Sequence, residues 1–268
     1  MINTNTLTPM DRAFKPSVTE FLNNYAFKSR PVILEGITDD WAASTKWTWE
    51  YVQDQFGSNI QFAKKCRNKA EPGKSFTITE YIEYMRNNND ADPFYLKNCQ
   101  FHRNTELIND YPLPEYLQSW HVALPEDSRP FLSWLYLASK DTFSSIHLDI
   151  FNTSAWNAVI SGKKLWLFYH PDDYDFLYDG IANPFEPDLN KFPYLSKTNP
   201  IWGIQSPGEV IYTPSNWWHA VYNLEAGISL TENFVNQSNY NAVLKNLYDN
   251  GLNEQAMAFE LIIKMSLA

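Results

Sequence analysis

The sequence predicts a mainly β domain, either a sandwich or a barrel, with helices before and after it. The first reason is a change of pattern near residue 131, after which short apolar segments follow one another with turn residues between them. The second is an aromatic share of 16%, spread along the chain, because aromatic side chains favour strands. The length of 268 residues suits one large domain with a sizeable core.

The first half of the chain alternates between helical and strand patterns. Residues 1–16 are polar, and we expect a flexible arm there. A Ser-x-x-Glu capping box predicts a helix at 17–27, and a Thr cap with a final Gly predicts one at 48–57. Apolar residues on one face predict a third helix at 77–88. Short apolar runs predict strands at 30–36, 60–65 and 93–98. Residues 104–127 are interrupted by Pro, and we expect short helices and loops.

The second half carries the repeated strand pattern. We expect seven strands, at 131–139, 144–149, 154–162, 163–170, 208–214, 219–225 and 228–235. A long insertion rich in Asp, Pro and Asn, residues 171–206, separates the fourth strand from the fifth. Insertions of this length are often functional or cover a substrate. We therefore expect one catalytic domain over 17–236, followed by a C-terminal helical segment over 237–268.

Composition narrows the classes of partner and compartment. The net charge is −10, and an acidic surface repels phosphate backbones, so nucleic acid is not expected as a partner. The same charge would attract basic partners, although it also serves solubility alone. Two cysteines, Cys66 and Cys99, make no disulfide framework and favour a reducing, cytoplasmic location. The N-terminus lacks a secretion signal pattern, and no apolar run is long enough to span a membrane.

Three residues form a candidate metal site: His147 and Asp149 in "IHLDI", and His219 in "NWWHAV". Residues two apart on a strand point to the same face, and paired strands could bring the distant histidine alongside. Two imidazoles and one carboxylate on one side of a metal leave the opposite positions open, as in non-haem Fe(II) sites. A bare His-x-Asp arises often by chance, so the surrounding segments carry much of the weight.

Those segments contain "TSAWNA", "GKK", "PGE", "WWH" and "TENF", in this order after the His-x-Asp. From about residue 17 to about residue 236 the sequence resembles the JmjC and cupin-like 2-oxoglutarate oxygenases. It is most similar to the branch of the Jumonji lysyl hydroxylase once called the phosphatidylserine receptor. The resemblance implies a double-stranded β-helix, or jelly roll. It also implies a dioxygenase that uses Fe(II), 2-oxoglutarate and O2, and releases succinate and CO2.

The resemblance also implies residues that hold 2-oxoglutarate. A buried cation is needed for its distal carboxylate, and Lys164 stands where the branch places that lysine. Its neighbour Lys163 should face outward by strand alternation. The remaining matches supply hydroxyl and amide groups, with a serine at 144 where the branch has threonine: Tyr95, Ser144, Asn157, Thr231 and Asn233. The two asparagines could equally well hydrogen-bond the backbone at the end of a strand.

Other conspicuous residues have simpler interpretations. Trp156, Trp217 and Trp218 either shield the metal centre from water or form ordinary core, and core packing is the better-supported reading. His102, His121 and His170 match no ligand position in the resembled branch, so we expect no metal there.

The substrate is the least determined feature. The resemblance implies a protein or peptide side chain, lysine being the best-known target, and leaves hydroxylation and demethylation both open. A free amino acid or a natural-product precursor is the alternative substrate. The competing class is a non-catalytic cupin-like binding module, although such proteins usually lack a triad residue or the lysine. Related oxygenases often dimerise through C-terminal helices, so we expect a homodimer; the alternative is that the tail folds back on its own barrel.

Overall fold

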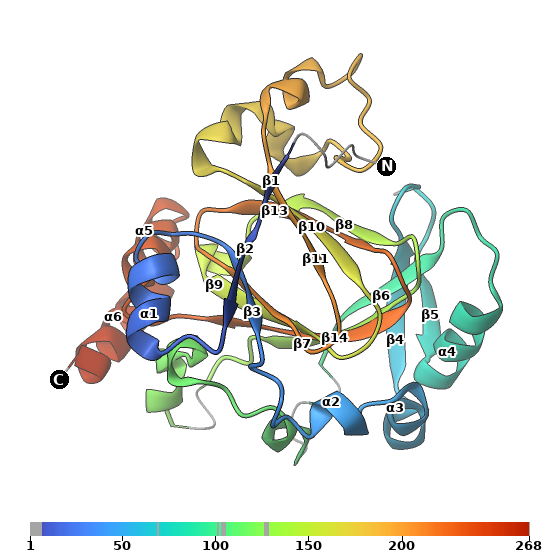
Figure 1. Ribbon diagram of the computed structural model, residues 1–268, viewed down its shortest axis with the longest axis horizontal. Coiled ribbons are helices and arrows are strands. Elements are labelled where there is room, and N and C mark those ends of the chain that lie inside the picture. Colours follow the sequence, from blue (N-terminus) through green and yellow to red (C-terminus); the bar gives the residue numbers. More distant parts are fainter. Residues whose placement is uncertain (1–6, 69, 101, 103–105, 126–128, 268) are drawn as a thin grey trace.

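The computed structural model describes residues 7–68, 70–100, 102, 106–125 and 129–267, and its strands surround a common interior (Figure 1). One sheet has five strands, in the order β1 (Thr8–Pro9), β11 (Ile201–Gln205), β10 (Lys164–Tyr169), β13 (Trp218–Asn223) and β8 (Phe143–His147). The other has nine, in the order β2 (Asp11–Phe14), β3 (Val32–Glu35), β12 (Val210–Thr213), β9 (Ser154–Val159), β14 (Gly227–Phe234), β7 (Ser133–Ala138), β6 (Phe94–Cys99), β4 (Ile60–Lys65) and β5 (Lys74–Thr77). The two mainly antiparallel sheets confirm the predicted jelly-roll class.

The N-terminal segment differs from the expected flexible arm. Residues 8–9 pair in parallel with β11, and residues 11–14 pair in parallel with β3, so this segment extends both sheets. Arg12 forms an ion pair with Glu35 on the neighbouring strand. A polar composition concealed these strands because edge strands expose much of their surface. Residues 1–6, which belong to the same predicted arm, lie outside the described residues.

The three expected helices form, the first two with the expected caps and the third with a capping box that was not predicted. Ser17 and Glu20 make the capping box of α1 (Val18–Phe21), which continues as a π-helix over Leu22–Ala26. Thr48 caps α3 (Trp49–Phe56), and Thr77 with Glu80 caps α4 (Ile78–Asn87). The short helix α2 (Ala43–Lys46) and the strands β5 and β11 were not predicted. Residues 104–127 contain the 3₁₀ helices Glu106–Asp110, Glu115–Leu117 and Trp120–Ala123.

The long insertion packs on the outside of the five-stranded sheet. It contains the 3₁₀ helices Pro171–Phe176, Tyr178–Gly180 and Pro193–Lys197 before β11 begins. Leu177, Phe185 and Leu195 bury themselves against the outward-facing Leu165 and Leu167 of β10. The insertion therefore supports the sheet from outside rather than covering the barrel interior.

The hydrophobic core has separate parts on the two sides of the nine-stranded sheet. Side chains from both sheets, among them Ile33, Trp166, Phe168 and Ile211, fill one part of the interior. A larger cluster lies mainly beneath the N-terminal helices and the 104–127 segment. One end of the barrel is thus closed by apolar packing, and polar side chains occupy the rest of the interior.

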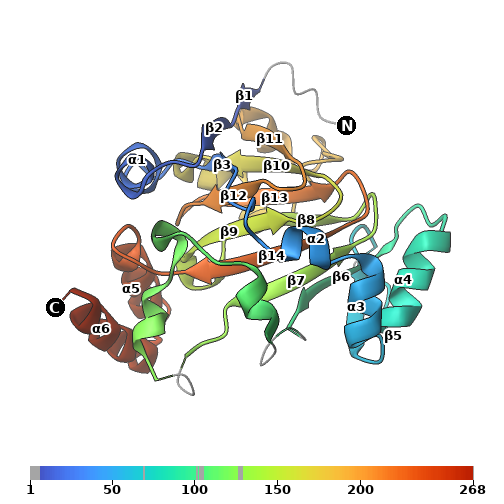
Figure 2. The same cartoon turned by 60° about the horizontal axis from the view of Figure 1, so that its bottom comes forward.

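The C-terminal helices α5 (Tyr240–Asp249) and α6 (Asn253–Leu267) fold back on their own domain, on the side away from α3 and α4 (Figure 2). Phe259, Ile262 and Ile263 pack with Val235 and, at the edge, with Trp120. In the part of the chain that the structure describes, no helix combines the length and the apolar character needed to cross a membrane.

Gly180 provides a test of how the insertion supports the sheet. It has φ +75°, and a Cβ there would collide with the backbone oxygen of Ile146, beside His147. Gly251 also has a positive φ but has nothing within 4 Å of its Cβ position. We predict that Gly251→Ala costs only the left-handed strain of about 1–2 kcal/mol, and that Gly180→Ala costs about 1–3 kcal/mol more. Urea unfolding of both variants measures this difference, and equal losses would contradict it.

Candidate metal centre and co-substrate pocket

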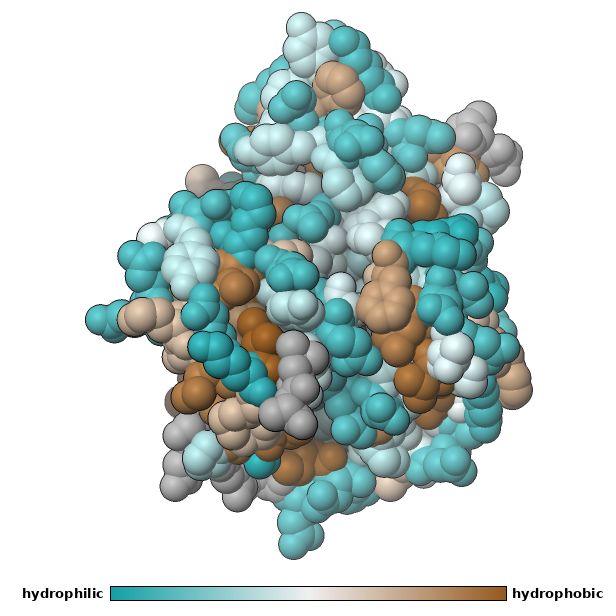
Figure 3. All heavy atoms as spheres, turned by 90° about the vertical axis from the view of Figure 1, so that its left-hand side faces the viewer, coloured by the Kyte–Doolittle hydropathy of each residue, from teal (hydrophilic) through white to brown (hydrophobic). Residues whose placement is uncertain are grey.

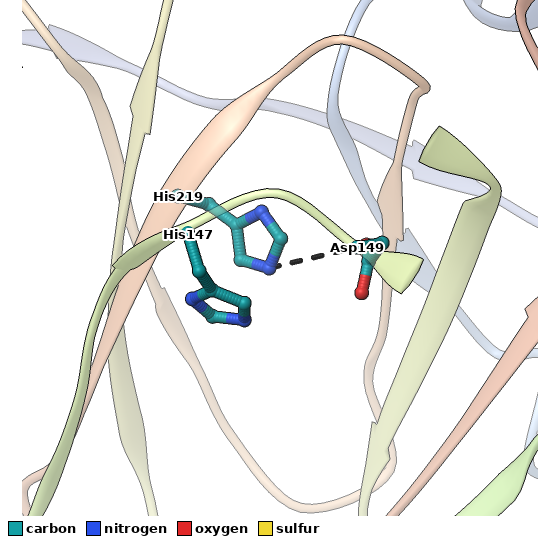
Figure 4. A group of neighbouring side chains, drawn as sticks. All are labelled: His147, Asp149 and His219. Atoms are coloured by element: carbon teal, nitrogen blue, oxygen red, sulfur yellow. Dashed lines mark ion pairs between the residues drawn. The ribbon is translucent and has the colours of Figure 1, made fainter. Parts of the chain in front are cut away.

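The two histidines of the candidate triad face each other across neighbouring strands. β8 and β13 pair in antiparallel fashion with His147 opposite His219, and the two ring centroids lie 4.3 Å apart (Figure 4). On its other side, His219 pairs with Phe168 of β10 and stacks on the rings of Phe168 and Trp166. Strand register therefore positions both imidazoles inside the barrel.

Asp149 reaches the site in a different way from the one predicted. β8 ends at His147, and Asp149 lies where the chain turns into the 3₁₀ helix Ile150–Asn152. The carboxylate does not cap that helix, so it stays available to the interior. Its Oδ2 lies 4.0 Å from Nε2 of His219. Alternation along one strand was therefore the wrong reason for placing Asp149 beside His147.

The turn after Asp149 is strained and is fastened to the loop that precedes His219. Phe151 and Asn152 have φ values of 53° and 56°, a region that costs non-glycine residues about 1–2 kcal/mol. The Asn152 amide donates to Oδ1 of Asn216 at 2.7 Å, and the Asn216 backbone N–H donates to Asn152 at 2.6 Å. These reciprocal bonds connect the two segments that carry the triad.

Backbone carbonyls set the orientation of both imidazoles. Nδ1 of His147 donates to Ser145 O at 2.7 Å, and Nδ1 of His219 donates to Trp217 O at 3.1 Å. Since a carbonyl oxygen only accepts, each ring carries its proton on Nδ1 and keeps a lone pair on Nε2. This is the tautomer that coordinates a metal through Nε2.

The donor set fits a divalent metal ion. One ligand atom from each of His147, Asp149 and His219 lies within 4.8 Å of the others. Burial and the neighbouring His219 lower the pKa of His147 to about 3, so it stays neutral, while burial raises the pKa of Asp149. Oδ2 of Asp149 is buried without a hydrogen-bond partner. A cation would supply the missing partner for that oxygen.

Beyond the triad, a small inner pocket of about 40 Å³ contains Lys164. Lys164 faces the interior as expected, and its Nζ donates to Oδ1 of Asn223 at 2.9 Å, whereas Lys163 faces outward and pairs with Glu225. Burial lowers the pKa of Lys164 to about 7. A bound carboxylate would favour the charged form and raise that pKa again.

The other predicted co-substrate residues gather at the same place. Tyr95, Ser144, Asn157 and Thr231 all line the inner pocket, and the Asn157 amide donates to the Thr231 hydroxyl. Asn233 lies at the outer side, where it donates to Thr153 and lines the outer cavity together with Asp149. Oδ1 of Asn157 is buried without a partner.

Sequence reasoning missed two polar residues of this pocket. Asn223 connects Lys164 to Thr142: its Oδ1 accepts from the Lys164 ammonium, and its amide donates to the Thr142 hydroxyl. Tyr136 forms a wall of the pocket, 5.7 Å from the Lys164 ammonium to the ring centroid. The alternation in "SWLYLA" could have indicated that Tyr136 faces the same side as Trp134. Asn223 had no local signal, because only the register of β10 with β13 places it opposite Lys164.

The tryptophans and remaining histidines have mostly structural places. Trp217 belongs to the core between the sheets, and Trp218 packs outside against Tyr174. Trp156 is fully buried and packs against Trp41 and Tyr111 in the larger core cluster, on the face of the nine-stranded sheet away from the pocket, so its place is core packing. His102, His121 and His170 contact Ser133, Ser119 and Asp172 and take no part in the triad.

An outer cavity of about 510 Å³ leads to the triad from the surface. It shares Tyr136, Ser144, His147 and Asp149 with the inner pocket, so the metal position lies between the two spaces. Its wall includes Lys97, Trp134 and the half-exposed Ile150. No residue of the insertion 171–206 lines either space, so the expectation that it covers a substrate is not met.

Comparison with known families identifies the fold family. Residues 18–243, most of the chain, match the family model described as a cupin-like domain. The chain belongs to the cupin-like domain family. The family assignment expected from the sequence motifs is thereby confirmed.

Curated relatives of this cupin-like chain carry names of oxygenases and demethylases. Lysine-specific demethylase JMJ21 of Arabidopsis thaliana is 34% identical over 87% of this chain and 26% of its own length. Bifunctional arginine demethylase and lysyl-hydroxylase psr-1 of Caenorhabditis elegans is 30% identical over 85% of this chain and 61% of its own. 2-Oxoglutarate and iron-dependent oxygenase JMJD4 of Gallus gallus is 29% identical over 86% and 60%. The chain thus spans between a quarter and three fifths of these relatives.

Removing a triad ligand tests the metal centre directly. We predict that His147→Ala or Asp149→Ala weakens Mn(II) binding more than about 100-fold. Residues that only hydrogen-bond a metal ligand contribute about 10–100-fold, and a ligand itself should contribute more. The fold should persist, because the lone carboxylate oxygen gains nothing from burial without a metal. Calorimetric titration with Mn(II) measures the affinity, and melting curves monitor the fold. Asp172→Ala, on an exposed carboxylate, is the control; equal affinities in all variants would contradict the assignment.

Proposed function

We propose that this protein is an Fe(II)- and 2-oxoglutarate-dependent dioxygenase that hydroxylates a C–H bond of a protein or peptide side chain. The single observation that carries the proposal is the arrangement of three neutral or anionic metal donors and one buried lysine around connected spaces. A binding module would have no need for a buried lysine whose charge is so costly. The names of the relatives agree with this class.

The proposed roles follow from the positions of the side chains. His147, Asp149 and His219 would hold the iron and leave its opposite face open to 2-oxoglutarate and O2. Bound iron and 2-oxoglutarate would supply the oxidising chemistry, and succinate and CO2 would leave. Lys164 would bind the distal carboxylate, with Asn223 and Thr231 holding the surrounding hydrogen bonds. Trp166, which lines the inner pocket, would keep water away from it.

The outer cavity supports a substrate presented on a polypeptide. Its volume of about 510 Å³ exceeds what one side chain needs, and it ends at the triad. Hydroxylation and N-demethylation share the same first oxidation of a C–H bond, so both are compatible with this site. We propose hydroxylation, since it needs no methylated substrate.

Succinate release tests the function. Purified protein receives Fe(II), 2-oxoglutarate and ascorbate, with and without a cell extract as a source of substrates. We expect 2-oxoglutarate to be consumed by the wild type and not by His147→Ala. Mass spectrometry of the extract should find peptides that have gained one oxygen atom. Consumption that survives in the variant, or no consumption with any extract, would refute the proposal.

The pair Lys163 and Lys164 offers a test within two residues. We predict that Lys164→Ala raises the KM for 2-oxoglutarate by about 10–100-fold, the equivalent of a charge-assisted contact of about 1.5–3 kcal/mol. Lys163→Ala should change it little, because Lys163 forms a surface ion pair with Glu225. Steady-state kinetics over a 2-oxoglutarate series gives both values. Similar changes in the two variants would show that Lys164 does not hold the co-substrate.

We also propose that the C-terminal helix mediates a homodimer. One face of α6 packs on its own domain, yet Met257, Leu261 and Met265 recur every four residues on another face and are 60%, 56% and 50% exposed. Apolar residues gather on the side of the molecule that carries α5 and α6 (Figure 3). An exposed apolar row of this kind suits a homodimer, because a two-fold axis brings the row of one copy against the same row of the other.

We predict that Met257→Glu combined with Leu261→Glu converts a dimer into a monomer, since charges are poorly tolerated at an apolar contact. Ile181→Glu, at an equally exposed apolar residue of the insertion, should leave the dimer intact. Light scattering at micromolar concentration determines the mass of each protein. A monomeric wild-type chain would contradict the proposal.

The two cysteines bear on the compartment. Cys66 and Cys99 are free thiols, and burial raises the pKa of both. We propose a cytoplasmic location, where thiols stay reduced. Cell fractionation that finds the protein in an oxidising compartment would contradict it.

A further inference from the structure

The inner face of the nine-stranded sheet does not stop at the barrel. Leu96 of β6 pairs with Leu137 of β7, and both are fully buried on the far face, so their neighbours Lys97 and Tyr136 face the outer cavity. β4 then pairs with β6, with Lys64 opposite Tyr95. Side chains opposite each other in an antiparallel pair share one face. The face that lines the cavity therefore continues onto β4.

Beyond β6 this face becomes exposed and carries apolar groups. Phe62 and Ile60 precede Lys64 by two and four residues, so they share its side of the strand, and they are 54% and 69% exposed. Ala63, on the other side, is completely buried. β4 and β5 form the edge of the sheet, on the opposite side of the molecule from α5 and α6 (Figures 1 and 2).

A second cavity of about 230 Å³ connects this face to the outer cavity. Lys97 and Ser145 line both spaces, and Lys64 and Phe143 line the second. The two spaces are neighbours that share these walls, and together they extend from the triad to β4. We call them together the β6–β4 groove.

The charge of the β6–β4 groove is opposite to that of the chain. Its described lining contains three lysines, Lys64, Lys65 and Lys97, and two carboxylates. One carboxylate is the proposed metal ligand Asp149, and the other, Glu71, already pairs with Lys65 at 3.0 Å. A chain with net charge −10 has placed a basic wall beside its site.

We propose that the substrate of this site is an acidic segment of a polypeptide, which lies along the β6–β4 groove with its carboxylates against Lys97 and Lys64. The proposal rests on the proposed function, whose substrate class it narrows. Neighbouring strands lie about 4.8 Å apart, so Lys64 is about 10 Å from β7, the span of about three extended residues. Acidic residues are thus expected within about three positions of the modified side chain, with an apolar residue beyond them at Phe62.

Direct binding of charged probes tests this inference without any turnover. Three fluorescein-labelled dodecapeptides share one sequence, except that four positions are all Glu, all Gln or all Lys. Fluorescence anisotropy with the full chain should show the Glu probe binding about tenfold more tightly than the Lys probe at low salt. The difference should shrink at about 1 M salt, where screening reduces the reach of charges to about 3 Å.

Two matched double variants distinguish the effect of the groove lysines on probe binding from the effect of the net charge. Lys64→Glu with Lys97→Glu should abolish or reverse the preference for the Glu probe. Lys28→Glu with Lys245→Glu makes the same change of charge at exposed lysines elsewhere and should preserve it. Melting curves check the fold, and Lys64→Glu alone replaces the double variant if that variant does not fold.

Two results would overturn the inference. One is equal or tighter binding of the Lys probe to the wild type, which would mean that the acidic surface as a whole governs recognition. The other is an equal loss of preference in both double variants. Either result leaves the succinate-release test of the proposed function unaffected, because binding of the probes requires neither iron nor 2-oxoglutarate.

Discussion

The pairing of β8 with β13 is the constraint on which the site depends. It places His147 opposite His219, and the next pairing, β13 with β10, places Phe168 behind His219 and Asn223 opposite Lys164. Lys164 and Phe168 are four residues apart, about 13 Å along one strand. One ladder of three strands therefore determines both where a metal would lie and how far the buried lysine is from it. A shift of β10 by one residue would turn the side chains of Lys164 and Phe168 to the outside of the barrel.

The histidines, the lysine and most of the strands could be predicted from the sequence. Their motifs are short and lie in strands with clear apolar patterns, so a resemblance in a few positions was enough to place them. The inward direction of Lys164 followed from the family resemblance, and alternation then turned its immediate neighbour Lys163 outward. Asp149 was placed correctly for an incorrect reason: the strand ends at His147, and a strained turn presents the carboxylate.

Several of the features that sequence reasoning missed depend on contacts between distant segments. β1 and β2 look like a polar arm because each has a single partner strand and exposes most of its residues. β11 is hidden in an insertion whose composition suggests a loop, and its pairing with β10 is what keeps it a strand. The amide of Asn223 matters only because Lys164 lies opposite. Local patterns do not carry such information.

The net charge describes the whole surface, whereas a substrate in the groove would meet the charges that line it. An acidic chain was expected to attract basic partners, yet the groove beside the triad is lined by Lys64 and Lys97. Screening at physiological salt limits the reach of exposed charges to about 8 Å, so a substrate at the metal position responds to the lysines of the groove far more than to carboxylates on remote surfaces. The excess of acidic residues keeps the molecule soluble and sets its long-range field. Under the proposed substrate preference, the few residues of β4 and β6 that face the cavity would select which polypeptide segments bind there.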